Sequence, residues 1–303
     1  MNPTPPRWLD WLKSLPLYVL PQHAMSRTVH ALARWKTPLK NPVLRWFIRH
    51  YGVDMSEAAE SSPEAYDSFN AFFTRALKDG ARPMDTDPLA LLSPADSTVS
   101  ALGPIQGGRI IQAKGHHYSL ETLLGSNPER ADAFRNGYFI TLYLSPRDYH
   151  RVHMPAAGRL LDTVYVPGRL FSVAPHTVRT IPGLFARNER VACLFDTDRG
   201  PLASVMVGAI NVGSIETVWA GEITPPRHEL TVTRYHDRPV QLARGAEMGR
   251  FNLGSTVILL LPEGPFTWRE DLAPGVRVRL GETIGKWEVG SGKWEVGRLK
   301  VEG

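Results

Sequence analysis

Short apolar runs separated by turn residues dominate the sequence from about Leu91 onward. Most of these runs are rich in the β-branched and aromatic residues that strands favour, and they are too short for typical buried helices. The DTDRG segment at 196–200 lies between two runs and predicts a β-hairpin. The sequence therefore predicts a β-rich domain. Its candidate strands lie in YFITLYLS, RLLDTVYVPG, VACLFDTDRGPLASVMVGAINVG, STVILLL and GVRVRLGETIG.

The first eighty residues carry helix signals instead. The segment NPVLRWFIRHYG has Asn41 as its helix cap, a proline directly after the cap, and Gly52 at its end. The segment SPEAYDSFNAFFTRALKDG repeats this pattern between Ser62 and Gly80, and its aromatic residues recur at helical spacing. We therefore expect two helices here, the second with an aromatic face in the core.

The amino-terminal part of the chain is also basic. Residues 1–50 hold eight Lys or Arg and one Asp, a net charge of +7 against +5 for the whole chain, and four of its eight Trp. Basic residues mixed with Trp and Leu suit an anionic membrane surface. Nucleic acid and a solvated helical face with Trp in the core are the alternatives. We predict an α+β fold, with a helical membrane-associating region over residues 1–60 and a β-rich catalytic domain over 61–303.

Several classes of protein do not fit the sequence. A single cysteine, Cys193, excludes an internal disulfide and a cysteine-rich metal site. No uncharged stretch reaches the roughly 18–20 apolar residues of a membrane-spanning helix. No GxGxxG or P-loop pattern predicts a nucleotide site. Asp10 lies where a secretory signal would have its apolar centre, so we expect this segment to remain in the mature protein.

Four residues are candidates for chemistry. Ser255 follows glycine in FNLGSTVILL, His150 and His153 lie in SPRDYHRVHMP, and Asp96 lies in SPADS. Each has a common structural role when taken alone, since Gly-Ser pairs form turns and turn aspartates bind nearby backbone. Two histidines could ligate a metal, but no further Cys or His lies at zinc spacing. The spacing allows an Asp–His–Ser relay, which only geometry can establish.

Many segments of the chain resemble the phosphatidylserine decarboxylase proenzymes of the short bacterial type. The LGST step is specific, because it is the self-cleavage signature of that family, and YHRVHMP and LFARNER are nearly as distinctive. One departure is Ser97, where the family commonly has glycine. The other matching segments are FNAFFTR, SPADS, QAKGHHYSLETLL, FRNG, YLSPRDYHRVHMP, YVPGRLFSV, LFARNERVACLFDT, VGSIETVWAG, ITPPR and MGRFNLGST.

This resemblance implies self-cleavage between Gly254 and Ser255. Ser255 would attack the carbonyl of Gly254, with His153 as the base and Asp96 holding the imidazole. The amide becomes an ester, and elimination then divides the protein into a β chain, 1–254, and an α chain, 255–303. The new terminus loses ammonia and becomes a pyruvoyl group, which serves as the cofactor.

The same resemblance implies how the cofactor is used. Loss of carbon dioxide from an amino acid leaves electrons that no ordinary side chain accepts, and the pyruvoyl carbonyl supplies that electron sink. We assign His150 to the substrate carboxylate, where it assists decarboxylation or returns the proton. Lys114, His116 and Tyr118 of KGHHYSL are predicted to bind substrate. We expect no metal.

The implied substrate is phosphatidylserine in a membrane and the product is phosphatidylethanolamine. At about 1 kcal/mol per basic residue near an anionic surface, half of the amino-terminal charges give roughly 3–4 kcal/mol, so buried Trp and Leu must supply the rest. We expect a peripheral enzyme on the cytoplasmic face of the bacterial inner membrane. Its α and β chains would stay associated, within a homo-oligomer that does not bind nucleic acid.

Two other functions are alternatives to the decarboxylase. A serine hydrolase with this relay would remain one intact chain and react with an activated-serine probe. A non-catalytic membrane-binding module would bind anionic vesicles, remain uncleaved and release no carbon dioxide. Replacement of Ser255 separates both from the decarboxylase.

Overall fold

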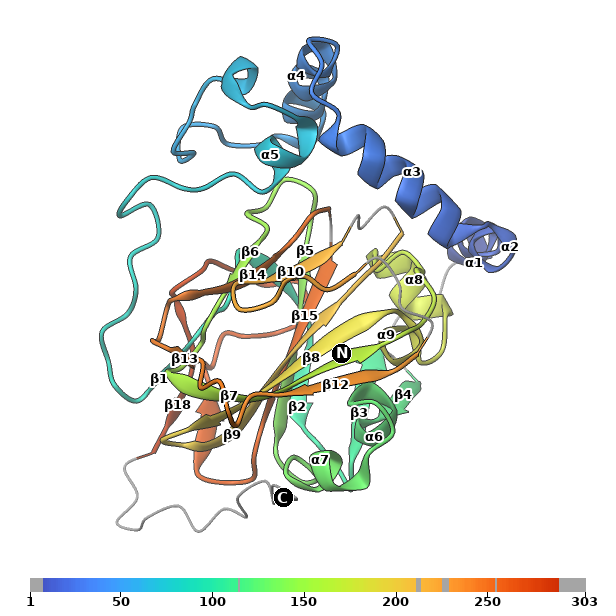
Figure 1. Ribbon diagram of the computed structural model, residues 1–303. Helices are drawn as coiled ribbons and strands as arrows, with labels where there is room; N and C mark the ends of the chain where they lie inside the picture. Colours follow the sequence, from blue (N-terminus) through green and yellow to red (C-terminus); the bar gives the residue numbers. More distant parts are fainter. Residues whose placement is uncertain (1–7, 114, 211–213, 225–228, 254, 289–303) are drawn as a thin grey trace.

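Antiparallel sheets form the centre of the molecule, and helices α1 to α5 lie along one end of it (Figure 1). The computed structural model describes residues 8–113, 115–210, 214–224, 229–253 and 255–288, with Ser255 described by its backbone alone. The helices are α1 (Trp8–Ser14), α2 (Pro16–Val19), α3 (Gln22–Arg34), α4 (Lys40–Tyr51), the 3₁₀ turn η1 (Pro63–Ala65), α5 (Phe69–Phe73), α6 (Leu120–Leu123), α7 (Pro128–Asp132), α8 (Pro175–Thr180) and α9 (Leu184–Arg187). None of these helices is long and apolar enough to cross a bilayer.

The largest sheet has the strand order β12-β7-β8-β9-β15-β5-β2-β17, with β13 paired to β7. Its strands are β2 (Ser97–Pro104), β5 (Tyr138–Leu144), β7 (Gly158–Val166), β8 (Arg190–Thr197), β9 (Gly200–Val207), β12 (Thr231–Arg234), β13 (Gln241–Leu242), β15 (Ser255–Leu261) and β17 (Arg277–Val278). The predicted hairpin at 196–200 is confirmed, because β8 and β9 pair up to Thr197 and Gly200. The STVILLL run is β15, a central strand paired with β5 and β9 on its two edges, and its apolar residues are buried.

Three smaller sheets complete the β structure. A four-stranded sheet, β11-β10-β14-β6, crosses the end of the large sheet where β15 begins (Figure 1). Its strands are β6 (Arg151–His153), β10 (Ile215–Thr217), β11 (Gly221–Glu222) and β14 (Glu247–Phe251). The others are β1 (Ala90–Leu92), β16 (Phe266–Trp268) and β18 (Thr283–Trp287) in one sheet, and β3 (Arg109–Ala113) with β4 (His116–Ser119) in a ribbon. The predicted α+β fold is confirmed.

Helix α4 confirms one predicted boundary and corrects the other. Gly52 ends the helix in the left-handed conformation, with φ 66°, where glycine has no steric penalty. Asn41, predicted as the cap, lies inside the helix, which begins at Lys40. The preceding turn already starts the helical hydrogen bonding, since the amide of Asn41 donates to the carbonyl of Pro38.

The helix predicted between Ser62 and Gly80 is wrong. Only the short turns η1 and α5 form, because Ser68 starts a new helix by accepting a hydrogen bond from the amide of Ala71. After α5 the chain is extended and pairs with an earlier segment, where Lys78 donates to Glu57 and Ala59 donates to Ala76. These long-range backbone bonds outweigh the helical periodicity of the segment.

A second, smaller hydrophobic cluster joins the helices to the sheets. Its buried members come from α3, α4, the turn after α4, α5 and the segment before β15: Ala33, Leu44, Phe47, Val53, Phe72, Phe73 and Leu253. The other end of the helical region is held by polar contacts, with Asp10 of α1 paired to Arg179 of α8 at 2.7 Å and Ser14 hydrogen-bonded to Thr180. The helices are therefore packed on the β core at both ends.

The small cluster makes α4 sensitive to its buried side chains. We expect Leu44→Ala to lower the free energy of unfolding by about 2–5 kcal/mol, because Leu44 is fully buried and leaves a cavity. Val43→Ala on the same helix removes a half-exposed side chain and should change stability by no more than about 0.5 kcal/mol. Urea unfolding followed by tryptophan fluorescence measures both. Equal shifts would contradict this view of the cluster.

Candidate active site

Two strand pairs position the chain on either side of Gly254. Ser255 begins β15 opposite Leu144, the last residue of β5. On the other side, β14 pairs with β6, and the amide of Phe251 donates to the carbonyl of His150 at 3.0 Å. The residues directly after Phe251 therefore leave β14 beside the end of the loop 145–150. The sheets bring together two segments that are about a hundred residues apart in the sequence.

The residues on either side of Gly254 are anchored in different cores. Leu253 belongs to the small helical cluster, whereas the strand from Thr256 onward lies in the centre of the large sheet. Asn252 is held by the amide of Asn70 and by Ser214, which accepts from the Asn252 side chain. Gly254 itself and the Ser255 side chain lie outside the described residues.

Asp96 lies at the same end of the large sheet, directly before β2. Both of its carboxylate oxygens are occupied: Arg82 donates to them over 2.8 and 2.6 Å, and the amide of Leu280 donates to one of them over 2.9 Å. The hydrogen bond to Asp96 raises the pKa of Arg82 above its usual value. Asp96 is thus a buried carboxylate held in place by an arginine and a backbone amide.

His153 lies on β6 with both ring nitrogens engaged. Nδ1 donates to the carbonyl of Gly245 over 2.8 Å, and Nε2 lies 3.2 Å from the hydroxyl of Tyr149. A carbonyl only accepts, so Nδ1 carries the proton of the neutral ring and Nε2 is left as the acceptor. Burial lowers the pKa of His153, and the charge of Asp96 is among the effects that oppose this.

The predicted relay is thus only partly assembled. The backbones of its first two members are adjacent, since the amide of His153 donates to the carbonyl of Pro94. Among the described residues, however, Asp96 bonds to Arg82 and Leu280, whereas His153 bonds to Gly245 and Tyr149. The expected hydrogen bond between Asp96 and His153 is not formed in this structure.

His150 is a fully buried histidine with an unpartnered nitrogen. Nδ1 donates to the carbonyl of Asp148 over 2.8 Å, and Nε2 has no hydrogen-bond partner among the described residues. The ring of Phe73 lies against it, with 4.1 Å between ring centroids. Burial lowers the pKa of His150 to about 3, so this imidazole is neutral at physiological pH.

Two of the three residues predicted to bind substrate lie on another part of the fold. His116 and Tyr118 are on the β3–β4 ribbon, where Tyr118 is buried against Phe185 of α9. Lys114 lies outside the described residues. Their assignment to substrate binding stays a prediction. Within the described ranges, no group of three or more His, Cys, Asp or Glu side chains is arranged to hold a metal ion.

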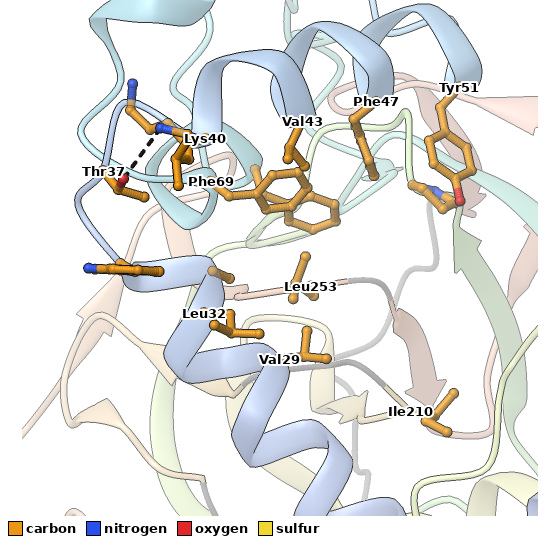
Figure 2. A pocket seen from close by; sticks show the side chains of 15 residues that line it. Val29, Leu32, Thr37, Lys40, Val43, Phe47, Tyr51, Phe69, Ile210 and Leu253 are labelled. Carbon is orange, nitrogen blue, oxygen red and sulfur yellow. Dashed lines mark hydrogen bonds between the residues drawn. The ribbon is translucent and has the colours of Figure 1, made fainter.

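An open apolar cavity of about 590 Å³ adjoins the segment before Gly254. Figure 2 shows it between α3 and α4, with Leu253 between them. Its walls are almost entirely apolar and come from α3, α4, α5, Pro146 and Ile210. A cavity of this size and character suits part of a hydrophobic ligand such as an acyl chain.

Sequence reasoning missed three side chains of this site. Arg82 holds Asp96, Tyr149 meets Nε2 of His153, and Arg75 is buried close by. Arg75 and Tyr149 both lie inside segments that carried the family resemblance, FNAFFTR and SPRDYHRVHMP. Nothing in the residue types distinguished them from ordinary structural residues.

Comparisons with known proteins agree with this architecture. The family described as phosphatidylserine decarboxylase matches residues 69–286, and a second family model, described as PSD, matches residues 12–52. A phosphatidylserine decarboxylase proenzyme of Alkalilimnicola ehrlichii is 60% identical over 288 residues, covering 93% of this chain and 98% of the relative. The proenzyme of Pseudomonas fluorescens is 56% identical over 275 residues, covering 88% and 94%, and that of Stutzerimonas stutzeri is 55% identical over 281 residues, covering 91% and 95%.

These relatives place the chain among self-processing lyases that are made as proenzymes. The chain belongs to the phosphatidylserine decarboxylase family. The resemblance predicted from the LGST step and its companion segments is therefore confirmed.

The buried neutral imidazole of His150 makes stability depend on pH. Its pKa falls from 6.5 to about 3 on folding, so below pH 6.5 the unfolded chain binds a proton that the folded chain does not. Stability is therefore lost as pH falls, by about 2 kcal/mol for this residue between pH 6.5 and pH 5.

Urea unfolding at pH 7 and pH 5 measures this loss, in an uncleaved Ser255→Ala background so that processing does not interfere. We expect His150→Gln in the same background to lose that part of the pH dependence. Identical pH dependence in the two proteins would show that His150 is not held neutral.

Proposed function

We propose that this enzyme converts phosphatidylserine to phosphatidylethanolamine with a pyruvoyl group that it makes from its own Ser255. The observation that carries the proposal is the placement of the Ser255 backbone at the start of β15. Strand pairing holds it opposite Leu144, directly before the loop that bears His150, at the sheet end where Asp96 lies. Family membership supports the reaction and its proenzyme state.

The surroundings of Ser255 fit a small carbonyl group at the start of β15. Thr256 Oγ1 and His150 Nε2 are buried and have no hydrogen-bond partner among the described residues, so both are available to polar atoms of a cofactor or substrate. A pyruvoyl group supplies the electron sink that decarboxylation of an amino acid needs. The backbone of Ser255 pairs with Leu144 of β5, and strands flank β15 on both edges from Thr256 onward.

In the self-cleavage step, Ser255 attacks the carbonyl of Gly254. His153 accepts the serine proton at Nε2, the ring nitrogen that its bond to Gly245 leaves without a proton. Asp96 stabilises the resulting imidazolium by its charge, and Arg82 fixes the position of that carboxylate. The amide C–N bond breaks as His153 returns that proton to the Ser255 nitrogen, which leaves an ester. Elimination then releases the carboxylate of Gly254 as the end of the β chain and leaves dehydroalanine at residue 255, which takes up water and releases ammonia to become the pyruvoyl group.

In the decarboxylation step, His150 faces the substrate carboxylate. A neutral imidazole beside the ring of Phe73 offers no positive charge, which disfavours the carboxylate relative to neutral carbon dioxide. The proton that replaces carbon dioxide comes from water, and His150 Nε2, which carries no proton while Nδ1 donates to Asp148, accepts it and passes it to the carbon.

The helical region suits a substrate that resides in a membrane. Thirteen of the seventeen large hydrophobic side chains that the described residues expose lie within α1 to α4 and their connections. Together with the basic charge of this region, they form a surface that can enter the interface of an anionic bilayer. The apolar cavity opens among the same helices and would receive an acyl chain. We assign the enzyme to the cytoplasmic face of the inner membrane as a peripheral homo-oligomer whose α and β chains stay associated.

Intact mass measurement under denaturing conditions tests the self-cleavage. We expect two chains divided after Gly254, the smaller one lighter by one ammonia than a fragment that begins with serine. Ser255→Ala should remain one chain and lose decarboxylation completely, because it lacks both the nucleophile and the source of the cofactor.

Three results would contradict the mechanism. Decarboxylation that persists in Ser255→Ala would exclude a pyruvoyl group derived from this residue. An intact wild-type chain that reacts with an activated-serine probe would indicate a hydrolase. An intact, unreactive chain that binds vesicles would indicate a binding module.

Membrane association should depend on the exposed tryptophans of α1. Trp8 and Trp11 are 69% and 43% exposed. We expect the double variant Trp8→Ser, Trp11→Ser to bind vesicles containing anionic phospholipid at least about tenfold more weakly, because buried apolar area drives interfacial binding. Leu230→Ser, at an exposed position outside the helical region, serves as the matched control. Equal binding of all three proteins in a vesicle sedimentation assay would refute the assignment.

A further inference from the structure

A small polar cavity of about 240 Å³ adjoins the large apolar one. Consecutive residues of the chain line the two cavities. Tyr51 lines the apolar cavity and Gly52 the polar one, and Pro146 lines the apolar cavity and Arg147 the polar one. Phe73 and Arg75 repeat this division at the end of α5. An amphipathic molecule could therefore place its chain in one cavity and its polar end in the other.

His150 lies between these two cavities. Its ring packs on Phe73, which lines the apolar cavity, while the two residues before it, Asp148 and Tyr149, line the polar one. Asp96 lines the polar cavity as well. The side chains proposed for the chemistry thus stand where the polar and apolar parts of a bound lipid would meet.

Most arginines of the polar cavity are neutralised by carboxylates. Arg82 pairs with Asp96 and Glu57, and Arg277 pairs with Asp148 over 2.8 Å. Arg279 likewise pairs with Glu57. These pairs account for Glu57, Asp96 and Asp148, whereas the remaining lining carboxylate, Asp54, accepts hydrogen bonds from Ser56. Two lining arginines have no ion pair among the described residues, and of these Arg147 is exposed and the other is buried.

The buried arginine is Arg75. It is only 4% exposed, it has no ion pair among the described residues, and its Nε has no hydrogen-bond partner there. Its guanidinium donates one long hydrogen bond, 3.3 Å from Nη2 to the carbonyl of Arg147, and it also lies over the ring of Phe72. A buried guanidinium without a carboxylate is costly unless an anion joins it, because arginine stays protonated in proteins.

We propose that Arg75 binds the phosphodiester of the lipid head group, an inference that rests on the proposed function. The planar guanidinium presents two parallel donors to phosphate oxygens. The substrate also carries a carboxylate, but a cation bound there would stabilise the very charge that decarboxylation must remove. The phosphodiester is unchanged by the reaction, so a cation can hold it from substrate to product.

Arg75 is therefore a binding residue for both substrate and product. Its loss should weaken binding of each by a similar factor and leave the chemical step largely intact, since binding the two states equally affects KM rather than kcat. It should also leave self-cleavage unchanged, because no lipid takes part in that step. A merely structural arginine would not produce this combination.

The test compares full-length wild-type enzyme with Arg75→Gln, Arg75→Lys and the control Arg135→Gln, whose exposed arginine pairs with Asp132 near α7. The substrate is a short-chain phosphatidylserine below its micelle concentration, and short-chain phosphatidylethanolamine is the product inhibitor. For Arg75→Gln we expect full self-cleavage, a KM raised about 10- to 100-fold, kcat within about threefold, and an inhibition constant raised by the same factor as KM. Arg75→Lys should recover part of this loss, and Arg135→Gln should match wild type.

Several outcomes would overturn the inference. A higher KM with unchanged inhibition by phosphatidylethanolamine would place Arg75 at the carboxylate, and unchanged kinetics would exclude a role in binding. Loss of self-cleavage in both Arg75 variants would make the residue structural. These results differ from failure of the proposed function itself, which would appear as absent cleavage and decarboxylation in the wild-type protein.

The wild-type enzyme provides a further measurement that needs no variant. Glycerophosphoethanolamine and ethanolamine share an amine, but only the first carries a phosphodiester. We expect glycerophosphoethanolamine to inhibit at concentrations at least about tenfold lower, as one charge-assisted contact predicts. Equal inhibition by the two compounds would contradict phosphate recognition.

Discussion

The pairing of β15 with β5 and β9 is the constraint on which the rest of this site depends. Backbone hydrogen bonds hold β15 on both edges from Thr256 to Leu260, and its side chains are buried on both faces of the sheet. A strand held in this way cannot slip by one residue without moving every side chain to the wrong face. The position of the Ser255 backbone is thus set by the whole sheet, and Leu144, where the loop from β5 to β6 begins, is paired directly opposite it.

The helical region packs against the segment that leads into β15. Leu253, just before the scissile step, enters the cluster that α3, α4 and α5 form, and the apolar cavity opens from the same cluster. The helices that expose Trp and Leu are therefore also the helices that line the apolar cavity. The proposed membrane contact, acyl-chain binding and chemistry would thus share one continuous part of the structure, which the polar cavity with Arg75 adjoins.

Sequence patterns predicted the secondary structure correctly where interactions over a few residues determine it. The apolar runs gave strands, DTDRG gave a hairpin, and Gly52 ended a helix, because periodicity and glycine conformation act over a few residues. The helical periodicity between Ser62 and Gly80 did not predict the structure, because the amide of Lys78 donates to the carbonyl of Glu57 in an earlier segment of the chain. At the site, residue types indicated His150, His153 and Asp96, but not that Arg82 would hold Asp96 or that Gly245 would hold His153. Gly245 lies 92 residues from His153, and Arg82 lies 14 residues before Asp96 in a segment without regular secondary structure, so only the folded chain shows these partners.

The strand order has a consequence for the life of the molecule after its proposed cleavage. The residues after Gly254 supply β15 to the middle of the large sheet, β17 to its edge, and β16 and β18 to another sheet. A cut before β15 would leave two chains interleaved strand by strand, and they could separate only by unfolding. An unfolded pair would then have to find each other by diffusion, without the tether that guided the first folding. Folding of this enzyme would be a one-way process, and its working lifetime would be governed by the height of the unfolding barrier rather than by an equilibrium.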